Sequence, residues 1–235
     1  TASNDRTLKV WSLNDGSQLS TLSGHKAGVR AVAVTANGRK LVSVSDDHVL
    51  MVWNLNSGRH LHTLSGHIGS VNALAMTPDE RALSGSADRT IKVWDLKSGD
   101  ELRSLKGHTA AVTALAVAPD GKWAVSGSDD STLRVWDLKT GEERKTLTGH
   151  TAGIHAVSIM SDGWKVVSVS MDGSSKVWDL ESGEALRTIN NNAFWIRAVA
   201  FAPDGQSLIM ASWDNTLKAW DLVNGRELCT IGTQA

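Results

Sequence analysis

The feature that most constrains the fold is a tryptophan that recurs along the whole chain. Six of the ten tryptophans follow one another at intervals of 42, 41, 42, 42 and 42 residues: Trp11, Trp53, Trp94, Trp136, Trp178 and Trp220. An aspartate stands six positions before each of them and a glycine five positions after. A period of this length is typical of a repeat protein, in which one small structural unit is stacked several times.

Residues 66–106 show what one repeat contains. Val71 to Met76 is a nearly continuous apolar run, which predicts a first strand buried on both faces. Three more strands are expected at 82–86, 90–94 and 101–105, and the last of these is polar enough for an outer edge. The turns between the strands are expected at 77–80, 88–89 and 97–99. No helical period occurs, so the sequence predicts an all-β fold of four-stranded antiparallel units.

The repeats also begin and end with recurring pairs of residues. Four repeats open on Gly-His, at Gly24-His25, Gly66-His67, Gly107-His108 and Gly149-His150. Four repeats close on Trp-Asp, at Trp94-Asp95, Trp136-Asp137, Trp178-Asp179 and Trp220-Asp221, whereas Trp11-Ser12 and Trp53-Asn54 depart from this ending. With these motifs the chain resembles the WD40-repeat family over essentially its whole length.

The resemblance implies a WD40-type β-propeller that forms a single domain over residues 1–235. Five complete blades are expected at approximately 24–65, 66–106, 107–148, 149–190 and 191–232. Residues 1–23 are expected to be a half blade that holds only a third and a fourth strand. Because six or seven such blades need more than 235 residues, and the chain begins inside a repeat, we expect a truncated propeller that is part of a longer protein.

The resemblance further implies a hydrogen-bonded chain of histidine, serine, aspartate and tryptophan inside each blade. The expected sets are His25, Asp47 and Trp53 with Ser43 or Ser45; His67, Asp88 and Trp94 with Ser84 or Ser86; His108, Asp130 and Trp136 with Ser126 or Ser128; and His150, Asp172 and Trp178 with Ser168 or Ser170. The sequence leaves the choice of serine open, because residues two apart on a strand point the same way. In the last repeat Asn192 replaces the histidine and Met210 the first serine, so we expect a chain there that is either broken or built differently.

The recurring Ser, His and Asp residues invite a catalytic interpretation, as a nucleophilic triad. A catalytic site is normally unique, whereas this combination occurs four times at the same spacing. We therefore expect that the protein is not an enzyme and has no catalytic residue. His60, His62 and His67 invite a metal site, but no cysteine or carboxylate stands near them at ligand spacing. We therefore expect no metal ion and no cofactor.

The charge balance bears on the class of partner. Lys and Arg number 24 and Asp and Glu number 25, which gives a net charge of −1 and no electrostatic argument for a nucleic-acid or membrane partner. No apolar run is long enough to span a bilayer. Cys229 is the single cysteine, which excludes an internal disulfide and fits a reducing compartment, so a cytoplasmic location is expected.

The remaining candidates for function are positions that vary between repeats. One set follows the first residue of the first strand: Arg30, Asn72, Thr113, His155 and Arg197. A second set directly precedes the aspartate that stands six positions before each periodic tryptophan, which we call the turn aspartate: Asn4, Asp46, Ala87, Asp129, Met171 and Trp213. By family analogy both sets lie on the face where partners dock. From them and their neighbour Trp195 we predict a protein-binding set: Trp195, Arg197, Trp213, Arg30, His155 and Met171.

The last repeat concentrates the residue types that are enriched at binding hot spots, in Trp195, Arg197 and Trp213. The alternative is that these tryptophans only fill space left by the degenerate repeat. Trp123 and Trp164 stand at the opposite end of their strands, where we expect them to cover the sheet and assign them no role.

The sequence thus predicts a non-enzymatic scaffold or sensor module that binds a protein or peptide. The alternative is an assembly module whose incomplete propeller edges pair with another chain, either a second copy or a different protein.

Overall fold

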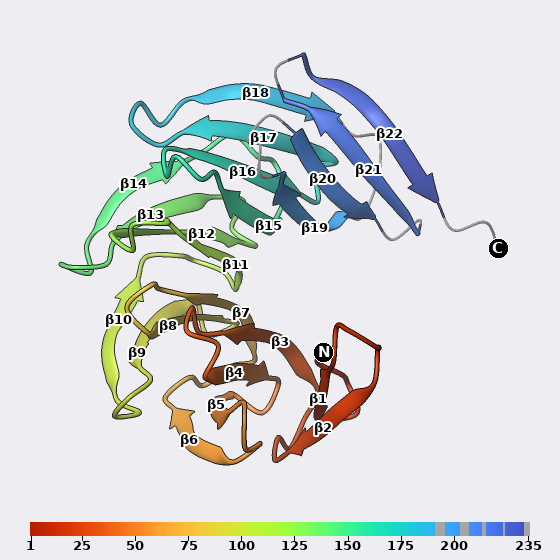
Figure 1. The fold of residues 1–235 in the computed structure, drawn as a ribbon. Coiled ribbons are helices and arrows are strands. Elements are labelled where there is room, and N and C mark those ends of the chain that lie inside the picture. Colours follow the sequence, from red (N-terminus) through yellow and green to blue (C-terminus); the bar gives the residue numbers. More distant parts are fainter. Residues whose placement is uncertain (191–195, 203–206, 213–214, 223, 233–235) are drawn as a thin grey trace. The chain divides into compact units, whose positions relative to one another are not determined.

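The computed structural model describes residues 1–190, 196–202, 207–212, 215–222 and 224–232, and for 196–198 only the backbone. Every regular element in this part of the chain is a β-strand, which confirms the all-β prediction. In the same residues no helix is long and apolar enough to cross a membrane. The chain divides into two compact units, Thr1–Gly107 and His108–Ala235, each built from successive antiparallel sheets (Figure 1).

The first unit holds one two-stranded and two four-stranded sheets. The two-stranded sheet pairs β1 (Thr7–Trp11) with β2 (Gln18–Ser23). The next sheet consists of β3 (Val29–Val34), β4 (Lys40–Ser45), β5 (Val49–Asn54) and β6 (His60–Ser65). The third consists of β7 (Val71–Met76), β8 (Arg81–Ser86), β9 (Thr90–Asp95) and β10 (Glu101–Lys106).

The second unit holds three four-stranded sheets. The first consists of β11 (Val112–Val117), β12 (Trp123–Ser128), β13 (Leu133–Asp137) and β14 (Glu143–Leu147). The second consists of β15 (Ile154–Ile159), β16 (Lys165–Ser170), β17 (Ser174–Asp179) and β18 (Ala185–Asn190). The third consists of β19 (Ile196–Phe201), β20 (Ser207–Ser212), β21 (Thr216–Asp221) and β22 (Arg226–Gly232).

In each sheet the strands lie side by side in chain order, so every connection between two strands of the same sheet is a short hairpin. These sheets are the blades of a WD40-type β-propeller, five of them four-stranded and the sixth partial, as the sequence predicts. The glycine five residues after each periodic tryptophan has a positive φ angle in all six hairpins, for example 86° at Gly99. Only glycine takes this conformation without steric cost, which explains its regular spacing.

Burial within a blade differs from the expectation in one respect. The second strand is the most buried one, since in β4, β8, β12 and β16 every residue after the first is buried. The first strand, expected to be buried on both faces, is only partly so, and in β7 just Val71 and Ala73 are buried. The reason is position in the sheet, because β7 is an edge strand whereas β8 has a strand on each side.

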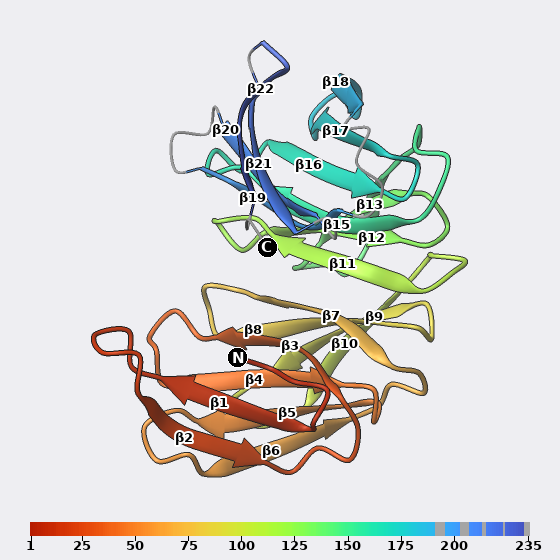
Figure 2. The same ribbon diagram turned by 90° about the vertical axis from the view of Figure 1, so that its right-hand side faces the viewer.

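The core lies between neighbouring sheets of the same unit. Leu64 from β6 packs with Val71 and Trp94 of the following sheet. Leu147 from β14 packs in the same way with Ile154 and Trp178. The two-stranded sheet follows this rule too, because its Leu8 and Leu22 pack with Trp53, and both views show β1 and β2 beside β3–β6 (Figures 1 and 2).

Candidate functional site

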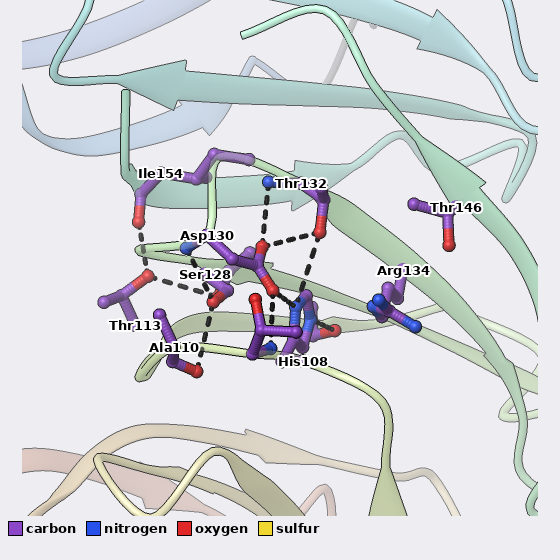
Figure 3. Close-up of polar contacts among 12 residues, drawn as sticks. His108, Ala110, Thr113, Ser128, Asp130, Thr132, Arg134, Thr146 and Ile154 are labelled. Atoms are coloured by element: carbon purple, nitrogen blue, oxygen red, sulfur yellow. Dashed lines mark hydrogen bonds and ion pairs between the residues drawn. The ribbon is translucent and has the colours of Figure 1, made fainter. Parts of the chain in front are cut away.

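The blade of residues 107–148 contains a continuous series of polar contacts around His108 (Figure 3). The indole nitrogen of Trp136 donates to the hydroxyl of Ser126 at 2.8 Å. That hydroxyl lies 2.7 Å from Nε2 of His108, and Nδ1 of His108 lies 2.8 Å from the carboxylate of Asp130. A neutral imidazole protonated on Nδ1 satisfies every contact, because it donates to Asp130 and accepts from Ser126. We call this series the polar chain of a blade.

The same polar chain occurs in the three other blades that begin with Gly-His. The distances from tryptophan Nε1 to serine Oγ are 3.0 Å in Trp53–Ser43, 2.8 Å in Trp94–Ser84 and 2.7 Å in Trp178–Ser168. Each serine lies 2.7 to 2.8 Å from Nε2 of its histidine, which is His25, His67 or His150. Nδ1 of these histidines contacts Asp47, Asp88 and Asp172.

The structure resolves the choice between the paired serines, since the first of each pair belongs to the polar chain. The second serine has a different role, which Ser128 illustrates. Its hydroxyl donates to the carbonyl of Ala110 and accepts from the backbone N–H of Asp130. Ser45, Ser86 and Ser170 make the equivalent pair of contacts. The second serine therefore fixes the turn that carries the aspartate.

A second hydroxyl also binds the aspartate of the polar chain, and this contact is not among the predictions from the sequence. Thr132 donates to Asp130 at 2.6 Å, and Thr90 and Ser174 do the same for Asp88 and Asp172. The signal is present in the sequence as a Thr or Ser two positions after the turn aspartate. Val49 stands at this position beside Asp47, so that blade lacks the contact.

In the polar chains the pKa values of three histidines and of all four aspartates are lowered, for different reasons. Burial lowers the pKa of His108 because the charged imidazolium loses its hydration, and the nearby Asp130 opposes this only in part. The pKa values of His67 and His150 are lowered for the same reason. Burial alone raises the pKa of Asp130, but hydrogen bonds from Thr132, the Thr109 amide and His108 outweigh it and lower the pKa to about 2. The polar chain is thus built for neutral histidine and ionised aspartate.

In the last blade the tryptophan–serine contact of the polar chain is missing among the described residues. Met210 occupies the serine position, and Nε1 of Trp220 is buried without a hydrogen-bond partner among the described residues. Asn192, which stands in place of the histidine, lies outside the described residues.

The geometry of the polar chain gives it no means of nucleophilic attack. The hydroxyl of each first serine is fully buried and already accepts a hydrogen bond from tryptophan. The three histidines considered as a metal site are not brought together, because His67 uses both ring nitrogens within its polar chain while His60 contacts Trp53 and Thr63. No metal-ligand cluster occurs in the described residues.

The variable residue at the start of each first strand sits on a β-bulge, which the sequence analysis did not foresee. In β3 the register pairs Val29 with Ser45 and Ala31 with Val44. Arg30 lies between them and is therefore opposite no residue of β4. The same irregularity occurs after Val71, Val112, Ile154 and Ile196. We call Arg30, Asn72, Thr113, His155 and Arg197 the bulge residues. A bulge releases a residue from the ladder and re-aims its side chain, which is common beside functional sites.

The predicted binding residues have different surroundings. In the first unit Arg30 is paired with Asp46 through its Nη2 at 2.8 Å. In the second unit Met171 is 47% exposed, and its backbone N–H bonds to Gly153 directly before the strand that carries His155. His155 and Met171 therefore lie at the same end of one blade. Trp195 and Trp213 lie outside the described residues, as does the side chain of Arg197, so the predicted corner of the last repeat stays a prediction.

Comparison with protein-family models gives five matches to one family, described as WD domain, G-beta repeat. The matched residues are 16–54, 58–95, 99–137, 141–179 and 183–221. Each match begins at the hairpin glycine, so it spans the fourth strand of one sheet and the first three strands of the next. A comparison with curated proteins returned no match.

These five matches cover most of the chain, and four of them contain a complete polar chain. The chain belongs to the WD40-repeat family.

Proposed function

We propose that this chain is a binding platform for a protein or peptide, acts as a scaffold or sensor module of a larger protein, and catalyses no reaction. WD40-repeat proteins generally serve as scaffolds for protein interactions. The observation that carries the proposal is the contrast between the constant polar chain and the changing bulge residues. The bulge positions hold Arg, Asn, Thr, His and Arg on otherwise equivalent strands, so four kinds of side chain stand at the same position of the repeat.

Within the second unit, His155 and Met171 are the described residues that best suit a partner. The side chain of His155 makes no hydrogen bond or ion pair with any described residue, and Met171 offers an exposed, adaptable apolar side chain. Arg30 is less available, because a partner has to compete with Asp46 for its guanidinium. Trp195, Arg197 and Trp213 remain part of the proposal on the basis of residue type.

A peptide-display selection against the whole chain tests the proposal, followed by calorimetric titration of the selected peptides. We expect the double variant His155→Ala, Met171→Ala to weaken binding at least tenfold, about 1.4 kcal/mol. Lys122→Ala is the matched control, because Lys122 is exposed at the opposite end of a neighbouring blade. If peptides bind both variants equally well, the bulge residues are not the binding surface. An unchanged affinity in Trp213→Ala removes the corner of the last repeat from the proposal.

One observation favours the alternative of an assembly module. Leu22, Leu64, Leu147 and Ile189 stand at equivalent places in fourth strands and are buried. Their counterpart Ile231 in β22 is 63% exposed, and every residue of β22 is exposed. An exposed apolar edge strand is a template for another strand or sheet. Light scattering after size-exclusion chromatography separates the two proposals, because association that rises with concentration supports assembly and a constant monomer mass supports the platform.

Three expectations about partners and place stay proposals. The balanced net charge of −1 argues against nucleic-acid and anionic-membrane partners, and the single cysteine fits a cytoplasmic location. Gel-shift, vesicle co-sedimentation and cell fractionation test them in turn.

A further inference from the structure

A cavity of about 610 Å³ lies in the second unit, at the end of the strands opposite to the bulge residues. Trp123, which begins β12, and Trp164, which immediately precedes β16, line it together with side chains from the hairpins 137–145 and 180–181. The two indole rings are roughly perpendicular, with centroids 5.3 Å apart. Trp164 is 48% exposed, so a large part of its surface is open to a ligand.

The repeat pattern shows that these tryptophans replace basic residues. The position of Trp123 holds Lys40, Arg81 and Lys165 in three other blades, and the position of Trp164 holds Arg39 and Lys122 in two others. In the first unit the consequence of a basic residue is visible, since Nζ of Lys40 lies 3.0 Å from the carbonyl of Leu96 in the next sheet and 3.4 Å from Glu80. In the first unit the ammonium group of Lys40 thus occupies the position that corresponds to the cavity beside Trp123 in the second unit.

The charges that line the cavity are mostly negative. Asp137, Glu142 and Glu181 face Arg144 and Lys145 there. Arg144 is already paired with Asp137, and Nζ of Lys145 bonds to the backbone carbonyl of Glu181 at 2.6 Å. Within the described part of the chain no ion pair engages the carboxylates of Glu142 or Glu181. The cavity therefore offers two unpaired acidic side chains beside an exposed indole.

Arg144 shows how this cavity holds a guanidinium group. Its Cζ lies 4.4 Å from the ring centroid of Trp123, while its Nε donates to Asp137 at 3.1 Å. Stacking on an aromatic ring and pairing with a carboxylate suit the planar guanidinium better than the compact ammonium of lysine. Trp164 and the Glu181 carboxylate repeat this combination, but among the described residues no cation stacks on the ring or forms an ion pair with the carboxylate. The two residues are held close together because Leu180 donates its backbone N–H to the carbonyl of Trp164 at 2.9 Å.

We propose that this cavity binds an arginine side chain of a protein partner, with the guanidinium stacked on Trp164 and paired with Glu181 and Glu142. The arginine takes the place that Lys40 of the chain itself fills in the first unit. The site is separate from the bulge residues, so it stands or falls independently of the proposed function.

Titration of the whole chain with two capped tripeptides tests the proposal, one with arginine and one with citrulline between two glycines. Citrulline has the same shape as arginine but no charge. The indole N–H signals in a nitrogen–proton NMR spectrum report the binding, and Trp164→Phe assigns the signal of Trp164. We expect the Trp164 signal to shift saturably with the arginine peptide and to require at least tenfold more of the citrulline peptide. A Trp164 signal that does not move, or that responds equally to both peptides, overturns the proposal.

Four variants locate the site. We expect Trp164→Ala to weaken binding about three- to tenfold, read on the indole signal of the adjacent Trp123, and Glu181→Gln about two- to fivefold, read on Trp164. Glu184→Gln is the matched control, an exposed carboxylate of the same hairpin outside the cavity lining, and should leave binding unchanged. Trp123→Lys restores the residue type of the other blades and should abolish binding, because the chain then fills the site itself. The remaining indole signals report whether each variant is folded, and unchanged binding in a folded Trp123→Lys or Glu181→Gln protein contradicts the proposed site.

Discussion

Two neighbouring blades of the second unit differ in how they hold their periodic tryptophan. In β15–β18, Trp178 is 1% exposed and donates to Ser168, which leads on to His150 and Asp172. In β19–β22, Trp220 is only partly buried, and its Nε1 has no partner among the described residues. Met210, 2% exposed, stands where the serine is expected and packs with an apolar cluster.

The register of the two sheets is nevertheless the same. Val166 pairs with Trp178 in one blade and Leu208 with Trp220 in the other. The polar chain is therefore not needed to align the strands, which backbone hydrogen bonds and apolar packing accomplish. We infer that its contribution is to stability, because each of its buried groups is satisfied only while the whole series is intact.

Acid should produce the largest effect, because it acts on all the polar chains at once. Folding lowers the pKa of His67, His108 and His150, so below the reference value of 6.5 the unfolded chain binds more protons than the folded one. Asp88 and Asp130, lowered to about 2 because hydrogen bonds outweigh the opposing effect of burial, add a further loss as the pH falls below about 5.

The free energy of unfolding, measured with urea from pH 8 to pH 3, should therefore decrease steadily toward acid. Removing one histidine, as in His108→Ala, should flatten the curve between pH 7 and pH 5. A stability that is constant or rises over that interval contradicts the assignment of neutral histidines.

Among substitutions, Trp178→Ala should cost the most, about 3–5 kcal/mol, since it removes a fully buried large side chain and orphans Ser168. Trp220→Ala should cost clearly less, because that tryptophan is partly exposed and makes no indole hydrogen bond to any described residue. Thermal and urea unfolding of both variants measure the difference, and equal losses would remove the distinction between the two blades.

His108→Ala should destabilise the protein by about 1–3 kcal/mol, because it leaves Ser126 and Asp130 without their partner. His155→Ala is the matched control, a histidine of the second unit that belongs to no polar chain, and should change stability by less than about 0.5 kcal/mol. A loss near zero for His108→Ala shows that the polar chain contributes nothing to stability.

The smallest effect is expected at the residue after the turn aspartate. Gly173 has a φ angle of 80° and open space around it, so Gly173→Ala should cost about 1 kcal/mol from backbone strain alone. Arg89 has a φ angle of 71° at the equivalent place and already bears that strain, so Arg89→Ala should be nearly neutral. The two urea midpoints decide this, and a similar shift for both variants speaks against strain as the cause.

The sequence predicts the strands well because their signals are local and repeated. Val71 to Met76 is found as β7 without change, and the other three strands of that repeat agree within one residue at each end. The degree of burial is less predictable, because an apolar run such as β7 does not reveal that it forms a sheet edge. The missing tryptophan–serine contact of the last blade follows from Met210, since a thioether offers no strong donor or acceptor in place of a hydroxyl.

Parts of the candidate site depend on information that no single repeat contains. Ser168 and Ser170 look alike in sequence, and only the register shows which one faces Trp178 and which one the turn. The bulge at His155 is a property of two paired strands. Trp123 and Trp164 were expected only to cover sheet ends, because their cavity forms between two sheets whose spacing the sequence does not state.

The central claim is that the first serine of each pair links tryptophan to histidine, and a double-mutant cycle tests it most directly. Ser168→Ala and Trp178→Phe, alone and together, should show a coupling of about 1 kcal/mol or more in the free energy of unfolding. The same cycle with Ser170→Ala, two residues along the same strand, should be additive within about 0.5 kcal/mol, because Ser170 contacts the turn and not the indole. Additivity in both cycles, or equal coupling in both, contradicts the account.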